Sequence, residues 1–157
     1  MNISDRISVA IGSLFGIGFL PLMPGTWGSL ATLPVVWLLL VYTGIPGVAF
    51  FTVLASIASW WSTAGFERYY GEDPGPLVMD EVAGQSLCLV LLLAFWGMNT
   101  EPALWVAAFI AFRFFDIVKW FGANAIQNFK GGFGVLADDL LAGIYAHLVV
   151  GLLIYFI

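Results

Sequence analysis

Acidic residues beside glycine-rich and proline-rich turns are the most informative chemical feature of this chain. Two adjacent pairs stand where apolar segments begin, and two further acids lie near other segment ends: Asp80 with Glu81, Asp138 with Asp139, Asp73 and Asp116. Carboxylates gathered on helix ends repel one another unless a cation neutralises them. Because oxygen ligands without histidine or cysteine favour a hard ion, we expect this ion to be Mg²⁺.

Cationic residues and small turns accompany these acids. Arg113, Asp116 and Lys119 are three residues apart and roughly share one helix face, and Lys130 opens a glycine-rich turn. Backbone N–H groups at such turns and at helix starts, such as PGTWGS at 24–29, bind anions. The combination predicts metal-assisted phosphate chemistry. Two simpler interpretations stay open, in which Thr26 or Ser29 only caps a helix and Arg113 with Asp116 is a structural ion pair.

The single cysteine and the single histidine exclude several kinds of phosphatase. A cysteine-nucleophile phosphatase has an arginine six residues after its cysteine, whereas Ala94 stands at that distance from Cys88. Lipid phosphatases with a histidine nucleophile need more than one histidine, and His147 is alone. The motif of phosphatidyl-group transferases is missing as well. The nucleophile that remains is either water activated by a metal ion or a carboxylate.

The composition places these residues in a membrane protein. Apolar residues make up 61% of the 157 residues and charged residues only 10%, whereas soluble domains contain about one quarter charged residues. The net charge of −5 argues against a nucleic-acid partner. We expect a single all-α domain over residues 1–157, a polytopic membrane helix bundle with about five transmembrane helices at 27–42, 46–66, 82–98, 102–118 and 138–157.

Passing the chain through a bilayer along these segments leaves every charged residue except Glu101 on one side. That side contains all Lys and Arg residues, so the positive-inside rule makes it cytoplasmic, together with the N-terminus. The segment 7–22 is interrupted by glycines and Pro21, and a full crossing would move Asp5 and Arg6 to the other side. We therefore expect an N-terminal interfacial or re-entrant helix, with a sixth span as the alternative.

Four motifs resemble the phosphatidylglycerophosphatase A family in their order and spacing. They are PGTWGS at 24–29, DPGPLVMDEVAGQ at 73–85, FRFFDIVK at 112–119 and KGGFGVLADDLLAG at 130–143. The resemblance runs from about Pro21 to Tyr145. It implies a Mg²⁺-dependent lipid phosphatase of the bacterial inner membrane. Such an enzyme hydrolyses the phosphomonoester of phosphatidylglycerophosphate, a phospholipid, to phosphatidylglycerol and phosphate at the cytoplasmic face.

The resemblance also implies roles for the residues that match these motifs. The expected metal ligands are Asp80, Glu81, Asp138 and Asp139. The expected catalytic residues are Asp73, Asp80, Asp116 and Asp139, of which Asp73 is either a base or only a turn residue before Pro74. The expected substrate-binding residues are Gly25, Thr26, Ser29, Arg113, Lys119 and Lys130.

Two functions of other classes remain as alternatives. A small membrane transporter or channel for an anion or a cation would use intramembrane charge and broken helices, but it would need polar residues along a path to the other face. In a non-catalytic membrane assembly subunit, the acidic residues would only be solvated side chains at helix ends. Replacing Asp80 or Asp139 by Asn would then leave function intact.

Overall fold

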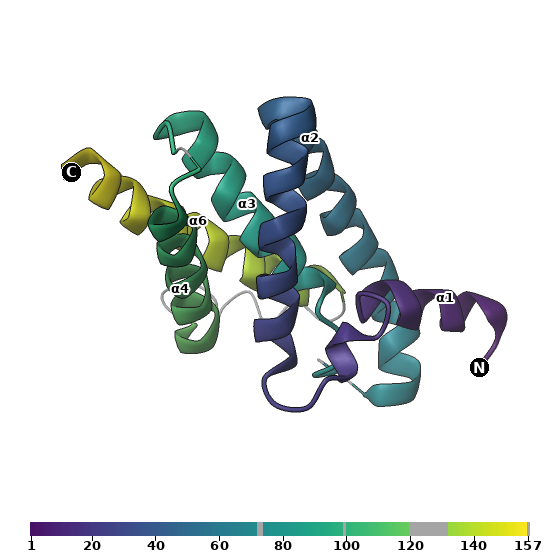
Figure 1. Ribbon diagram of the computed structural model, residues 1–157. Helices are drawn as coiled ribbons and strands as arrows, with labels where there is room; N and C mark the ends of the chain where they lie inside the picture. Colours follow the sequence, from purple (N-terminus) through teal and green to yellow (C-terminus); the bar gives the residue numbers. More distant parts are fainter. Residues whose placement is uncertain (72–73, 99, 120–131, 157) are drawn as a thin grey trace.

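The computed structural model describes residues 1–71, 74–98, 100–119 and 132–156. Within these ranges every regular element is helical, and the helices follow the order α1 (Ile3–Gly12), the 3₁₀ helix η1 (Ile17–Phe19), α2 (Pro24–Tyr70), α3 (Met79–Phe95), α4 (Pro102–Val118) and α6 (Gly132–Phe156). The all-α expectation is therefore confirmed for the described residues. Figure 1 shows α2, α3 and α4 arranged as a bundle, with α6 crossing it obliquely and α1 against one end of α2.

α2 is a helical hairpin. At Gly44 the backbone has φ +70° and ψ −169°, and the chain reverses direction there (Figure 1). Glycine adopts a positive φ without the steric penalty of a Cβ atom. Pro46 follows the bend, where the second arm begins. The two arms coincide with the expected segments 27–42 and 46–66, and the first, from Pro24 to the bend, is about 30 Å long at 1.5 Å per residue.

The other expected apolar segments also coincide with helices. The segment 82–98 overlaps α3, 102–118 matches α4, and 138–157 lies within α6 except for its last residue, although α6 begins earlier, at Gly132. Among the described helices, α2 and α6 are long and apolar enough to cross a membrane. α3 and α4 have 17 residues each, at the lower end of the spanning range of about 17–25. Five membrane crossings therefore stay a prediction.

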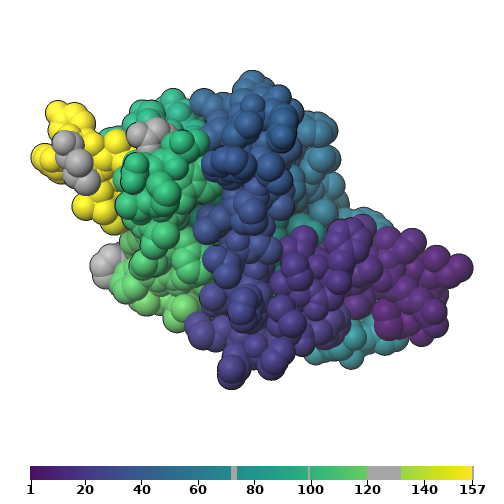
Figure 2. All heavy atoms as spheres, in the orientation of Figure 1, coloured from purple at the N-terminus to yellow at the C-terminus, as the bar shows by residue number. Residues whose placement is uncertain are grey.

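The core lies between the two arms of α2 and the helices α3, α4 and α6. Leu89, Phe112 and Val150 come from α3, α4 and α6 and are almost completely buried in it. In the space-filling view, α4 and the first arm of α2 meet side by side (Figure 2). Many large apolar side chains point outward instead, among them Phe50, Val53, Ile57 and Leu152. An apolar outer surface of this extent favours contact with lipid over contact with water.

α1 is held against the end of α2 by a buried carboxylate. Asp5 is 2% exposed and accepts hydrogen bonds from Arg68 Nη1 at 2.8 Å and from the Tyr69 hydroxyl at 2.9 Å. α1 has ten residues and ends at Gly12, and the backbone turns at Gly16, φ +102°, before η1. The segment 7–22 is therefore not one continuous helix. At about 15 Å, α1 is half as long as a hydrocarbon core is thick.

Candidate active site

Four helix ends meet at one end of the bundle, namely the starts of α2, α3 and α6 and the end of α4. The hairpin bend at Gly44 lies at the other end, together with the end of α3 and the start of α4 (Figure 1). At the start of α2, a Cβ atom on Gly25 would lie 3.0 Å from Arg113 Nη1 of α4 and would overlap Oε1 of Glu81 from α3. Lys119, which directly follows α4, and Asp138 of α6 form an ion pair at 2.8 Å. These contacts join all four helix ends.

Three acids form a compact cluster at this place, which we call the acid cluster: Asp80, Glu81 and Asp139. Each offers one carboxylate oxygen, and the three oxygens all lie within 4.8 Å of one another. Asp80 and Asp139 are 6% and 5% exposed. One oxygen of each acid is buried without a hydrogen-bond partner among the described residues. Negative oxygens buried in this way are unfavourable unless a cation compensates them.

The donor set of the acid cluster fits a hard divalent cation. All three groups are carboxylates, the ligands that Mg²⁺ prefers, and no nitrogen or sulfur ligand belongs to the cluster. Oxygens on opposite sides of Mg²⁺ lie about 4.2 Å apart. The three carboxylate oxygens all lie within 4.8 Å of one another, so at most small side-chain movements would bring them to binding distance.

Two glycines bring α3 and α6 close enough for the acid cluster to form. A Cβ atom on Gly84 would lie 2.5 Å from the carbonyl oxygen of Asp139, and one on Gly143 would overlap the carbonyl oxygen of Gly84. Small residues allow such close helix contact inside membranes. Because Gly84 is one turn after Asp80 and Gly143 is one turn after Asp139, this contact sets the distance between the two acids.

Arg113 is the cation next to the acid cluster. Its Nη1 atom contacts Asp116 one turn later on α4, lies 3.9 Å from Oε1 of Glu81 and donates a 3.5 Å hydrogen bond to Oγ of Ser29. Only 13% of the Arg113 side chain is exposed. A guanidinium group has five N–H donors, and Nε of Arg113 has no partner among the described residues. Arg113 thus has donors left for an anionic ligand.

The start of α2 faces the same charges. Ser29 Oγ donates to the Gly25 carbonyl at 2.8 Å, while the Thr26 hydroxyl oxygen is buried without a partner within the described residues. The first N–H groups of a helix have no partner within the helix, so they can receive an anion. Gly25, Thr26 and Ser29, the three residues of PGTWGS expected to bind substrate, therefore lie next to Glu81 and Arg113.

The adjacent acids Asp138 and Asp139 lie in different surroundings in the structure. Asp139 joins the acid cluster, whereas Asp138 faces Lys119, which directly follows α4. Asp116 contacts Nη1 of Arg113, which also lies 3.9 Å from Glu81, so Arg113 stands between Asp116 and the acid cluster. Lys119 and Asp138 are thus placed beside the acid cluster and paired with each other.

Two residues expected at the site, Asp73 and Lys130, lie outside the described residues. The structure adds Gln85, for which the sequence suggested no role. Gln85 is fully buried one turn after Glu81 on α3. The spacing of four residues between Glu81 and Gln85 is the signal that identifies this pair from sequence.

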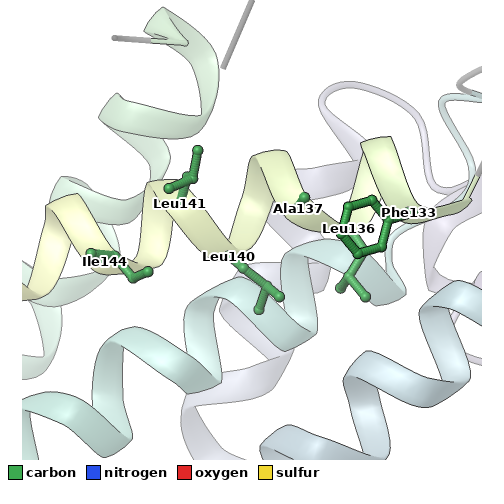
Figure 3. Close-up of a pocket in the computed structure, with 6 residues that line it drawn as sticks. All are labelled: Phe133, Leu136, Ala137, Leu140, Leu141 and Ile144. Atoms are coloured by element: carbon green, nitrogen blue, oxygen red, sulfur yellow. The ribbon is translucent and has the colours of Figure 1, made fainter. Parts of the chain in front are cut away.

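An apolar pocket of about 260 Å³ lies along α6 beside the acid pair (Figure 3). Its lining residues are Phe133, Leu136, Ala137, Leu140, Leu141 and Ile144. Ala137 directly precedes Asp138, and Leu140 directly follows Asp139. The pocket and the two acids are therefore at the same level of α6 but on different faces of the helix, since successive residues point about 100° apart.

Comparison with known proteins gives a consistent result. The family model described as Phosphatidylglycerophosphatase A matches residues 10–154. A protein of Bacteroides thetaiotaomicron named Putative phosphatidylinositol-3-phosphatase is 38% identical over 151 residues, which cover 92% of this chain and 91% of that protein. No solved structure gives a significant match.

Two relatives carry the name Phosphatidylglycerophosphatase A. The protein of Haemophilus influenzae is 36% identical over 144 residues, with 90% of this chain and 84% of the relative covered. The protein of Escherichia coli is 32% identical over 143 residues, with 87% and 76% covered. These matches confirm the resemblance of the four motifs, and the chain belongs to the phosphatidylglycerophosphatase A family.

Proposed function

We propose that this protein is a Mg²⁺-dependent lipid phosphatase that hydrolyses phosphatidylglycerophosphate to phosphatidylglycerol and phosphate. The observation that supports the proposal is the contact between the acid cluster and Arg113, because carboxylates that could hold a metal ion stand next to a guanidinium group that could bind an anion. The family membership supports the reaction, and the names of two relatives support the substrate.

Asp80, Glu81 and Asp139 would hold the Mg²⁺ ion, which when bound supplies positive charge to the phosphoryl oxygens. Arg113 would donate hydrogen bonds to the same phosphate group and stabilise the charge that develops in the transition state. Asp116 would orient Arg113 through their contact. In this arrangement the carboxylates would bind the positive metal ion, and the guanidinium group would bind the negative phosphate group.

The start of α2 would receive the remaining phosphate oxygens. Gly25 leaves room next to Glu81 and Arg113, and the buried hydroxyl of Thr26 is a donor without another partner among the described residues. Ser29 is hydrogen-bonded to the Gly25 carbonyl and to Arg113, and so holds the backbone and the cation together. Lys119, paired with Asp138, lies at the edge of this site and would attract the anionic headgroup.

A lipid substrate suits the surroundings of the site. Its phosphomonoester would sit among the four helix ends while its acyl chains stay in the leaflet along outward apolar surfaces, such as the α6 pocket (Figure 3). We place the protein in the bacterial inner membrane with five crossings and with the active site and the N-terminus in the cytoplasm. The basis is the positive-inside rule applied to Arg6, Arg68, Arg113, Lys119 and Lys130.

A second candidate substrate is phosphatidylinositol 3-phosphate. The relative from Bacteroides thetaiotaomicron, whose name refers to that lipid, is 38% identical to this chain. Both lipids combine a diacylglycerol phosphate with a terminal phosphomonoester on a polyol. The proposed site would recognise the phosphate group, which both lipids share. The polyol is the part that differs between the two substrates.

The test is phosphate release by the purified protein from phosphatidylglycerophosphate, phosphatidylinositol 3-phosphate and phosphatidic acid, each with Mg²⁺ and with EDTA. We expect rapid release from phosphatidylglycerophosphate, loss of release in EDTA and recovery when Mg²⁺ is restored. Release from none of the three lipids in Mg²⁺ would refute a phosphatase and favour a transporter or an assembly subunit. Trapping of a labelled aspartate would distinguish attack by a carboxylate from attack by water.

A further inference from the structure

Gln85 is a buried polar side chain to which the proposed function assigns no role. It is 0% exposed, and both its amide nitrogen and its amide oxygen lack a hydrogen-bond partner within the described parts of the chain. A buried amide without partners is unfavourable, so most buried amides in proteins are paired. Gln85 therefore needs an explanation that packing alone does not provide.

The surroundings of Gln85 contain unpaired atoms of complementary kind. Glu81 lies one turn earlier on the same face of α3, and its Oε2 atom, an acceptor, has no partner in the described structure. Arg113 lies near the same turns of α3, since its Nη1 atom is 3.9 Å from Glu81 and the ring of the adjacent Phe112 reaches within 2.7 Å of where a Gly84 Cβ would be. Nε of Arg113, a donor, is also unpaired there.

An amide group matches this pair of neighbours. Its NH₂ group donates two hydrogen bonds and its oxygen accepts, whereas Glu81 can only accept and Arg113 can only donate. The amide nitrogen and oxygen of Gln85, Oε2 of Glu81 and Nε of Arg113 are all unpaired among the described residues. We propose that Gln85 is a positioning residue of the metal site, whose amide would donate to Glu81 and accept from Arg113 when the site binds its ligands, so that the two side chains keep their separate orientations. This inference rests on the proposed function, because it assigns Glu81 to the metal and Arg113 to the phosphate.

The competing explanation is that Gln85 only fills space. The two explanations predict different changes in thermal stability and in metal affinity when the amide is replaced by an apolar group of similar length. If Gln85 is only a packing residue, Gln85→Met removes an unpaired polar group, raises the thermal unfolding midpoint and leaves metal affinity unchanged. If Gln85 orients Glu81, the same substitution weakens metal binding, because partners of metal ligands typically contribute about 10-fold to 100-fold in affinity.

The experiment measures Mn²⁺ binding by electron paramagnetic resonance, with the full chain in phosphatidylcholine nanodiscs and no substrate. The variants are Gln85→Met and, as a second apolar replacement should that one misfold, Gln85→Leu. Ser86→Ala is the matched control, since Ser86 is equally buried on the next position of α3 and bonds only the Ala83 carbonyl of its own helix. Asp139→Asn is the reference for a lost ligand.

We expect both Gln85 variants to bind Mn²⁺ about 10-fold to 100-fold more weakly than the parent protein. They should also have a higher KM for the lipid, because Arg113 loses its orientation, whereas Ser86→Ala should match the parent. Gln85 variants that bind Mn²⁺ like the parent while Asp139→Asn does not would overturn the role of Gln85 alone. A parent protein that binds no Mn²⁺, or an Asp139→Asn variant that binds it normally, would overturn the proposed metal site and with it this inference.

Discussion

The carbonyl oxygen of Asp139 lies directly against Gly84, which brings α3 and α6 into close contact one turn after Asp80. A side chain on Gly84 would meet backbone atoms of Asp139 and the ring of Phe112, and neither can move aside freely. The position of Asp139 relative to Asp80 therefore depends on the absence of a single Cβ atom.

Replacing Gly84 by Ala should separate the two helices. We expect a loss of about 1–3 kcal/mol in the free energy of unfolding, the usual cost of overpacking, together with loss of phosphate release. Denaturant titration in micelles and the phosphatase assay measure the two effects. Gly75→Ala is the control for stability, because a Cβ atom on Gly75 meets nothing within 4 Å. A Gly84→Ala protein as stable and active as the parent would show that α3 and α6 do not pack as described.

The two acids of the second pair should respond differently to neutralisation. Asp139→Asn removes a member of the acid cluster, so phosphate release should fall by several orders of magnitude at an unchanged protein level. Asp80→Asn should lower phosphate release to the same extent for the same reason. Asp138→Asn removes the partner of Lys119, and we expect a smaller loss, of about 10-fold to 100-fold, as for a residue that contacts the site without holding the metal ion. Glu101→Gln, at the other end of the bundle, is the control. Equal losses for Asp138→Asn and Asp139→Asn would place Asp138 among the ligands.

Arg113 should not be replaceable by lysine. Arg113 contacts Asp116, Glu81 and Ser29 through one planar group, and a lysine ammonium cannot reproduce this geometry. We expect kcat/KM to fall by about 10²-fold to 10³-fold in both Arg113→Lys and Arg113→Gln, the range seen when one donor to a transition-state oxyanion is lost. Steady-state kinetics with the lipid measure this. Nearly full activity in Arg113→Lys would mean that Arg113 supplies only charge.

Asp5 should control the docking of α1 and leave the chemistry unaffected. Asp5→Asn removes the charge that pairs with Arg68 and weakens the bond from Tyr69, so we expect α1 to open more easily, by about 1–2 kcal/mol. Hydrogen exchange of residues 3–12 measures this opening. Arg6→Gln is the matched control, because Arg6 is exposed on the same helix. Unchanged exchange in Asp5→Asn would assign the attachment of α1 to apolar packing.

Several features of this protein follow from sequence alone. The composition and the apolar segments predicted an all-helical protein, and α4 lies at the expected residues, because a run of apolar residues long enough to bury itself in lipid is also long enough to form a stable helix. The four motifs identified the family, since their order and spacing are specific. The carboxylates at helix starts indicated a hard metal ion from ligand chemistry.

The tertiary structure alone decided how the site residues are divided. Asp138 and Asp139 are neighbours in sequence and point about 100° apart on a helix, so the rotation of α6 determines which acid joins Asp80 and which faces Lys119. That rotation is set by the contact of Gly84 and Gly143 between two helices far apart in the chain. Local sequence patterns determine helices and their faces. The packing of one helix against another determines which face meets which partner, because it depends on the fit of all the side chains and glycines at the contact.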